Sequence, residues 1–151
     1  MAAQIGSSCV AHRSTSAVAS TTAATVKAMT WTAVSNIKDV NSALEAGQAD
    51  VTIRGSTFKT YIAGMLDATV EFEMVWDSSD ADFTAIQTAF LAKTLVAMSF
   101  LDGAAATTGK QGFVANFAVT NFSRNEPLEE AVTVSVTLKP STFAQWYTVP
   151  A

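Results

Sequence analysis

The sequence predicts a mainly β protein, an antiparallel β-sandwich or barrel with one flanking α-helix in a single domain. A chain of 151 residues is long enough to bury one core of its own. Several short segments rich in β-branched and aromatic residues are separated by turns rich in Gly and Thr, which is typical of antiparallel sheets. Only one stretch, residues 79–93, repeats apolar side chains at helical spacing.

The N-terminal part, residues 1–29, is rich in Ala, Ser and Thr and is expected to form an arm outside the main domain. Cys9 to Arg13 can form a short first strand, and the stretch that follows indicates a mobile loop. This stretch offers too little apolar burial to offset its ordering entropy, so we expect it to become ordered only on assembly. The β domain is expected to span residues 30–140, with residues 141–151 as a C-terminal tail.

The β domain begins with extended segments ahead of a loop. Thr30 to Ile37 is rich in β-branched and aromatic residues, Asp39 to Leu44 continues extended, and Gly47 interrupts the run before Val51 to Ile53. The segment Arg54 to Gly64 shows no clear periodicity and is expected to be a long ordered loop. Loops of that length in a small domain usually have a function.

The clearest strand signal lies between Asp67 and Trp76, where side chains alternate with period two. The face that should pack on the core carries Ala68, Val70, Phe72, Met74 and Trp76. The face that should meet water carries Thr69, Glu71, Glu73 and Val75.

A helix is expected directly after this strand. Ser79 with Asp82 three residues later matches a capping box, and Asp80 adds favourable charge at the positive end of the helix dipole. The apolar stripe of this helix, which should cover one edge of the sheet, consists of Phe83, Ile86 and Phe90. Further strands are expected at Thr94–Leu101, Phe113–Phe122 and Val132–Lys139.

The composition argues against several functional classes. The net charge is −4, with 9 basic and 13 acidic residues and no basic run, which disfavours tight binding to nucleic acid. The single histidine, His12, and the single cysteine, Cys9, cannot supply a nucleophilic triad or the ligand set of a zinc site. The stretch Gly103 to Gln111 has the wrong spacing for a phosphate-binding loop. We therefore expect no enzymatic activity, no cofactor and no metal.

The sequence also bears on location. A single cysteine excludes an intrachain disulfide and fits a reducing compartment. The N-terminus shows no secretory signal, and no run approaches the roughly 20 apolar residues of a membrane helix. We expect a protein that is made in the cytosol and does not bind membranes.

Four segments within residues 30–140 carry a resemblance to a known family. They are Trp31–Val40, Glu45–Gly55, Leu66–Asp77 and Val119–Pro140. In sequence and in order they resemble the major tail tube proteins of long-tailed, siphovirus-type bacteriophages, whose architecture is related to that of type VI secretion tube proteins.

The resemblance implies a structural subunit of the virion tail, assembled in the host cytoplasm, that would form stacked hexameric rings. The lumen would conduct genome DNA during ejection, and a tape-measure protein would fill it before that. Tail terminator, baseplate and tip proteins would be further partners. The alternatives are a tube or decoration subunit of another phage-derived particle (a bacteriocin, a gene transfer agent or a secretion tube) and a soluble ligand-binding β-barrel. A β-sandwich hydrolase would lack a catalytic base.

Three groups of residues are expected to serve this assembly. Glu71 and Glu73 should face the lumen, where like charge keeps DNA from adhering. Arg124 and Glu126 should pin the turn before Pro127 or bridge neighbouring subunits. The loop that should contact the next ring includes Arg54, Gly55, Phe58, Lys59 and Tyr61.

Overall fold

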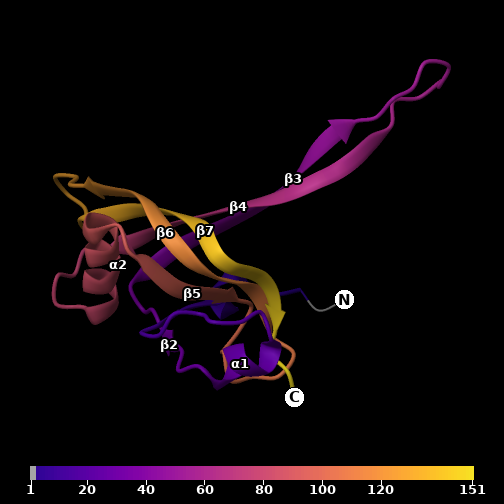
Figure 1. Cartoon of the computed structure of the whole chain (residues 1–151). Helices are drawn as coiled ribbons and strands as arrows, with labels where there is room; N and C mark the ends of the chain where they lie inside the picture. The colour runs from indigo at the N-terminus through magenta and orange to yellow at the C-terminus, as the bar shows by residue number, and fades with distance from the viewer. Residues whose placement is uncertain (1–2) are drawn as a thin grey trace.

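The computed structural model describes residues 3–151, in which a curved sheet of seven strands carries two α-helices (Figure 1). The strands are β1 (Val10–Ser14), β2 (Thr32–Ala33), β3 (Ile37–Asp50), β4 (Tyr61–Val75), β5 (Leu95–Leu101), β6 (Gln111–Asn125) and β7 (Thr133–Thr148). The helices are α1 (Ala23–Ala28) and α2 (Ala81–Ala92), and a 3-10 turn, η1, spans Gly6–Ser8. Among these residues no helix is long and apolar enough to cross a membrane.

The sheet has the order β2-β1-β5-β6-β7-β4-β3, and every neighbouring pair is antiparallel. The two edge strands, β2 and β3, are consecutive in the chain and only three residues, 34–36, join them. The sheet must therefore curl until its edges approach each other. Val34 in this connection is buried in the core, and the N–H of Val75 donates to the carbonyl of Asn36 (2.9 Å). The predicted mainly β, barrel-like fold with a flanking helix is confirmed.

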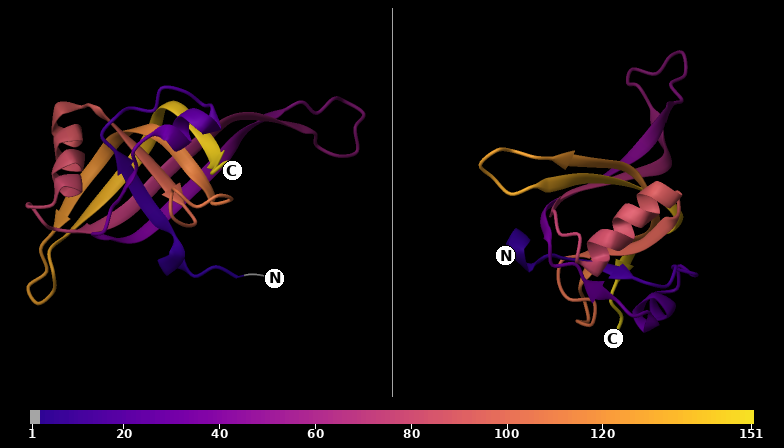
Figure 2. Two further views of the ribbon diagram at one scale, coloured as in Figure 1. Left: turned by 90° about the horizontal axis from the view of Figure 1, so that it is seen from below. Right: turned by 90° about the vertical axis from the view of Figure 1, so that its left-hand side faces the viewer.

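The main core lies inside the curl, beneath α2, which crosses one end of the sheet (Figure 2). Period-two alternation supplies its residues from the strands, among them Val70, Phe72 and Met74 of β4. From α2, Phe83 and Ile86 are fully buried, and each contributes roughly 1.5–3 kcal/mol by leaving water. The Phe83 ring meets the Trp76 ring edge to face at 4.9 Å. The predicted apolar stripe of the helix is confirmed.

A second apolar cluster lies on the opposite face of β5, β6 and β7, where the N-terminal segment packs. Val18 and Val26 from this segment are buried there against Val114 and Tyr147. Asn116 anchors the segment, since its side-chain oxygen accepts from the N–H of Val18 and its side-chain nitrogen donates to the carbonyl of Val18, both at 2.8 Å. The strand β5 and residues 112–117 of β6 are thus buried on both faces.

The N-terminal segment therefore differs from the expected mobile arm. The short strand β1 pairs with both β2 and β5, and α1 lies where a loop was expected. The buried Val18 and Val26 supply apolar contacts within the single chain, so the reason for expecting order only on assembly no longer holds. Residues 1 and 2 of the expected arm lie outside the described residues.

Several other element boundaries also differ from those expected. The strand β3 continues through Gly47 to Asp50, because a β-bulge between β3 and β4 absorbs the irregularity where Gly47 faces Gly64. Tyr61 to Gly64 belong to β4 and not to a loop, whereas Val51 to Ile53 are not a strand. The expected C-terminal tail, residues 141–151, is largely the end of β7, which pairs with β6 up to Thr148.

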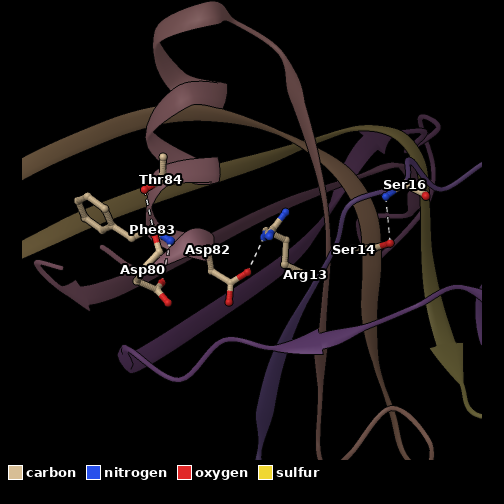
Figure 3. A network of polar contacts seen from close by, with 7 residues as sticks. All are labelled: Arg13, Ser14, Ser16, Asp80, Asp82, Phe83 and Thr84. Carbon is tan, nitrogen blue, oxygen red and sulfur yellow. Dashed lines mark hydrogen bonds and ion pairs between the residues drawn. The ribbon is translucent and has the colours of Figure 1, made fainter. Parts of the chain in front are cut away.

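The start of α2 also corrects the predicted cap. Asp80 is the N-cap residue, and its carboxylate accepts from the N–H of Phe83 (2.9 Å; Figure 3). Ser79 instead donates its hydroxyl to Asp77 (2.6 Å), and this contact, with the N–H of Ser79, lowers the pKa of Asp77. Asp82, the expected partner in the capping box, points away from Asp80 towards Arg13.

The ion pair between Arg13 of β1 and Asp82 of α2 ties the helix to the N-terminal strand. Their atoms Nε and Oδ1 lie 2.6 Å apart, and the two side chains are 14% and 12% exposed. Removing one partner from such a buried pair leaves an uncompensated charge. We expect Arg13→Ala to lower the free energy of unfolding by about 3 kcal/mol, and Arg13→Ala with Asp82→Ala to cost less. Urea unfolding of both variants tests this. The expectation would be contradicted if the single variant lost no more free energy of unfolding than the double variant.

His12 should make stability depend on pH. Its Nε2 accepts from the N–H of Ala105 (3.2 Å), which requires a neutral ring, and burial lowers the pKa of His12 from 6.5. The unfolded chain then binds the proton more readily than the folded chain. The free energy of unfolding should keep its full value above pH 6.5, and it should fall as the pH drops from 6.5 towards the pKa of His12 in the folded chain. Melting temperatures measured between about pH 5.5 and 7.5 test this. The dependence of melting temperature on pH should be absent in His12→Gln. An equal pH dependence in the wild-type and variant proteins would contradict the assignment to His12.

Candidate assembly surfaces

The face of the sheet opposite the main core is polar along four strands, β3, β4, β7 and β6. On β4 it carries Glu71 and Glu73, as the alternation predicted, and register places Asn41 and Thr137 beside Glu71, and Ser135 beside Glu73. A shallow depression in this face is lined by Asp39, Glu71, Glu73 and Asn121, among others. We call this surface the acidic face.

The acidic face contains more carboxylates than the two predicted. Glu45 pairs in register with Asp67, two strand positions beyond Thr69, so both join Glu71, Glu73 and Asp39. Lys139 opposes them from β7, with its Nζ 3.2 Å from a carboxylate oxygen of Asp67. Alternation of polar residues through Asp39, Asn41 and Glu45 was the sequence signal that could have found the β3 part.

The hairpin formed by β3 and β4 extends well beyond the body of the molecule (Figure 1). Pairing between β4 and β7 begins at Val70, so residues 61–69 of β4 pair only with β3. At about 3.3 Å per residue, this part is roughly 30 Å long. Leu66 and Met65 on it are 76% and 91% exposed. We call residues 46–66 the arm; none of its side chains is buried in the single chain.

The tip of the arm, residues 51–60, is ordered by its own hydrogen bonds. Thr52 donates its N–H to Asp50 (2.9 Å) and accepts at its hydroxyl from the N–H of Thr60 (2.9 Å). The side chain and backbone of Thr52 thereby lower the pKa of Asp50. Ser56 donates its hydroxyl to the carbonyl of Phe58 (2.6 Å). Gly55 has φ +102°, a conformation that glycine adopts without strain.

Most of the residues predicted for the stacking loop lie together on the tip. Arg54, Phe58 and Lys59 lie on the tip and are exposed, with Phe58 at 82%. Tyr61 lies in β4 at the base of the tip, opposite Asp50. Arg54 and Lys59 form no ion pair with any residue in 3–151.

The turn between β6 and β7, residues 126–132, protrudes at the opposite end of the molecule. Arg124 at its base pairs with Glu126 and places its guanidinium over the Trp76 ring, 4.4 Å from the centroid. These contacts within the chain support a turn-pinning role for Arg124 and Glu126. Leu128 in the turn is fully exposed.

Two strand edges are left open at the sides of the acidic face. β3 pairs only with β4 over its whole length. β5 pairs with β6 only up to Ala118, so beyond it β6 has β7 on one side and, within residues 3–151, no strand on the other. These edges offer unpaired backbone groups to another chain. No three His, Cys, Asp or Glu side chains in the described part of the chain converge to hold a metal ion.

Comparison with known proteins gives one family and several solved structures of similar fold. The family model for phage tail tube proteins matches residues 11–142. No curated protein matches the chain. Among solved structures, the SPP1 tail tube gives a TM-score of 0.75 at 11% identity, covering 99% of this chain and 81% of that one.

Two further solved structures are similar in fold. The tail of an empty gene transfer agent particle, with C6 symmetry, gives a TM-score of 0.72 at 13% identity and covers 97% of this chain and 100% of that one. The 6-fold symmetrised baseplate of the anti-feeding prophage gives a TM-score of 0.63 at 5% identity and covers 100% of this chain and 99% of that one.

Proposed function

This chain belongs to the phage tail tube protein family, and from that premise we propose that six copies close into a ring and that rings stack into a hollow tail tube. The protein is a structural subunit of a phage tail. A sixfold ring is supported by the C6 symmetry of the gene transfer agent tail, which shares the fold. The observation that carries the ring is the pair of open strand edges beside the acidic face.

The open edges fit each other in direction. Because β6, β7, β4 and β3 alternate, β6 and β3 run in opposite directions. A rotation about an axis roughly parallel to the strands preserves these directions, so β3 of one copy meets β6 of the next antiparallel. This pairing would continue the ladder between subunits with the same hydrogen-bonding pattern as within them. The four-stranded layers of six copies would then form one closed barrel without edges.

The acidic face is expected to line the lumen of this barrel. The other face of the layer is covered by α2 and β5 of the same chain, so that part of the chain lies outside the ring. The face left for the channel carries five carboxylates (Asp39, Glu45, Asp67, Glu71, Glu73) and the amine of Lys139. Such a wall repels phosphates and lets genome DNA pass without adhering.

As a tail tube subunit, the protein would bind other tail proteins and would need no catalytic activity. A tape-measure protein would occupy the lumen before ejection, and tail terminator and baseplate or tip proteins would bind the ends of the tube. Contact with a baseplate is supported by the likeness to the anti-feeding prophage baseplate. The subunit would assemble in the host cytoplasm. The tube of a gene transfer agent is a second candidate, favoured by the full coverage of that tail subunit.

Negative-stain electron microscopy of the purified protein, together with sedimentation velocity, tests the proposal. Rings or tubes with a central channel are expected. A monomer at every concentration and salt condition would instead favour a soluble ligand-binding barrel and would contradict the proposed function.

Reversing the charge of the lumen should slow DNA passage without preventing assembly. In a phage carrying Glu71→Lys and Glu73→Lys, triggered ejection should be slower than in wild type by about tenfold or more, most strongly at low salt where screening is weak. The variant Glu71→Gln with Glu73→Gln is the matched control and should eject at nearly the wild-type rate. Equal ejection rates of Lys and wild-type virions at low salt would exclude a lumenal position.

A further inference from the structure

The two ends of the molecule carry opposite charge. The arm tip projects at one end, and the turn between β6 and β7 projects at the other (Figures 1 and 2). The tip, residues 51–60, carries Arg54 and Lys59 and no acidic residue. The turn carries Glu129 and Glu130, and neither forms an ion pair within residues 3–151.

Both ends also present an apolar side chain that nothing in the chain covers. Phe58 on the tip is 82% exposed and Leu128 on the turn is 100% exposed. Both ends are held in place by contacts within the chain: the tip by Thr52 and Ser56, the turn by Arg124. A surface that is already ordered loses little entropy on binding. The two ends are thus complementary in charge and in apolar character.

We propose that the arm tip of one subunit docks on the β6–β7 turn of a subunit in the adjacent ring, with Arg54 and Lys59 against Glu129 and Glu130, and Phe58 against Leu128. This inference rests on the proposed function and names the partner surface of the stacking contact. The contact joins two different surfaces of one chain, so repeating it produces an open polymer and not a closed dimer. Tip against tip and turn against turn would bring like charges together, which fixes the direction of stacking.

The reach of the arm is consistent with this contact. Residues 61–66 of β4, which lie beyond the body, extend roughly 20 Å at strand geometry, and the tip lies beyond them. The tip can therefore pass beyond its own ring while the body stays in register with its neighbours.

Charge reversal tests the pairing. A tip variant (Arg54→Glu with Lys59→Glu) and a turn variant (Glu129→Lys with Glu130→Lys) should each form rings and should need at least about tenfold higher concentration to form tubes at low salt. Combining all four changes restores complementarity and should bring this concentration back to within about threefold of wild type. The matched control is Glu71→Lys with Glu73→Lys, which makes the same charge change as the turn variant and should leave stacking unchanged.

Cross-linking provides a second measurement. In a Cys9→Ser background, Phe58→Cys together with Leu128→Cys should give a ladder of covalent oligomers on oxidation, whereas either cysteine alone should give at most dimers. A ladder and rescue by the combined variant support the contact. If the wild-type protein forms tubes, any of three results would overturn the contact. Both charge-reversed variants could stack normally, the combined variant could fail to restore stacking, or the double-cysteine protein could give no ladder of covalent oligomers. Failure of the wild-type protein to form rings or tubes would instead contradict the proposed function itself.

Discussion

Replacing residues 51–60 by the dipeptide Asn-Gly is expected to give a folded subunit that forms rings and no tubes. Asp50 and Tyr61 are paired across the hairpin, so a two-residue type I′ turn can join them without changing the register. The change removes Phe58, Arg54 and Lys59 and leaves every buried residue of both clusters in place. Because the tip contributes no core contact, the melting temperature should change little while axial association is lost.

A variant whose tip is replaced by ten Gly and Ser residues is the control. It keeps the length of the tip and removes the side chains that would make the stacking contact. It should also form rings without tubes if the side chains of the tip carry the stacking energy. Electron microscopy and sedimentation report both outcomes, and circular dichroism reports folding. Tubes of normal length from the Asn-Gly variant would refute a stacking role for this segment.

The substitution Gly112→Ala is expected to prevent folding. Gly112 is buried in β6 between Leu101 of β5 and Tyr147 of β7. A Cβ atom there would lie 1.7 Å from the carbonyl oxygen of Phe100 and 2.7 Å from its carbonyl carbon. Backbone cannot move aside as a flexible side chain can, so β5 and β6 would have to separate. We expect a loss of about 4 kcal/mol or more, a large share of a domain's typical stability.

Chemical denaturation and soluble expression measure this effect. Gly6→Ala is the matched control, because no atom lies within 4 Å of the added carbon, and its stability should stay within about 0.5 kcal/mol of wild type. A soluble Gly112→Ala protein of wild-type stability would show that the strands can part at little cost.

The sequence predicted best those elements that bury one face in the chain's own core. The alternation between Asp67 and Trp76 and the stripe of Phe83, Ile86 and Phe90 were visible because burial imposes a period. The arm escaped prediction because its side chains have no core in the single chain, so residues 46–50 and 61–66 carry no burial pattern. Pairing across Gly47 was likewise hidden, since a bulge breaks the alternation on which the prediction relied.

The N-terminal segment and the helix cap show two other limits. A segment of small residues can pack through a few well-placed side chains, and the spacing of Val18 and Val26 gave no period to detect. Ser79 and Asp80 are both good N-cap residues, and only the three-dimensional position of Arg13 explains why Asp82 turns away from the capping box. Of the candidate surfaces, the acids on β4 followed from alternation. The alternation through Asp39, Asn41 and Glu45 indicates the acids on β3, but only the structure shows their register with β4.

The open edge of β3 has a consequence for how the protein must be handled by the cell. A strand of 14 residues that pairs on one side only is a template for uncontrolled aggregation while subunits wait to assemble. The charges of Lys38, Asp39 and Glu45 along β3 should disfavour parallel, in-register stacking of identical strands, because it would bring like charges together. Newly synthesised subunits should therefore stay soluble until a growing end captures them, and neutralising these three residues should send the protein into inclusion bodies.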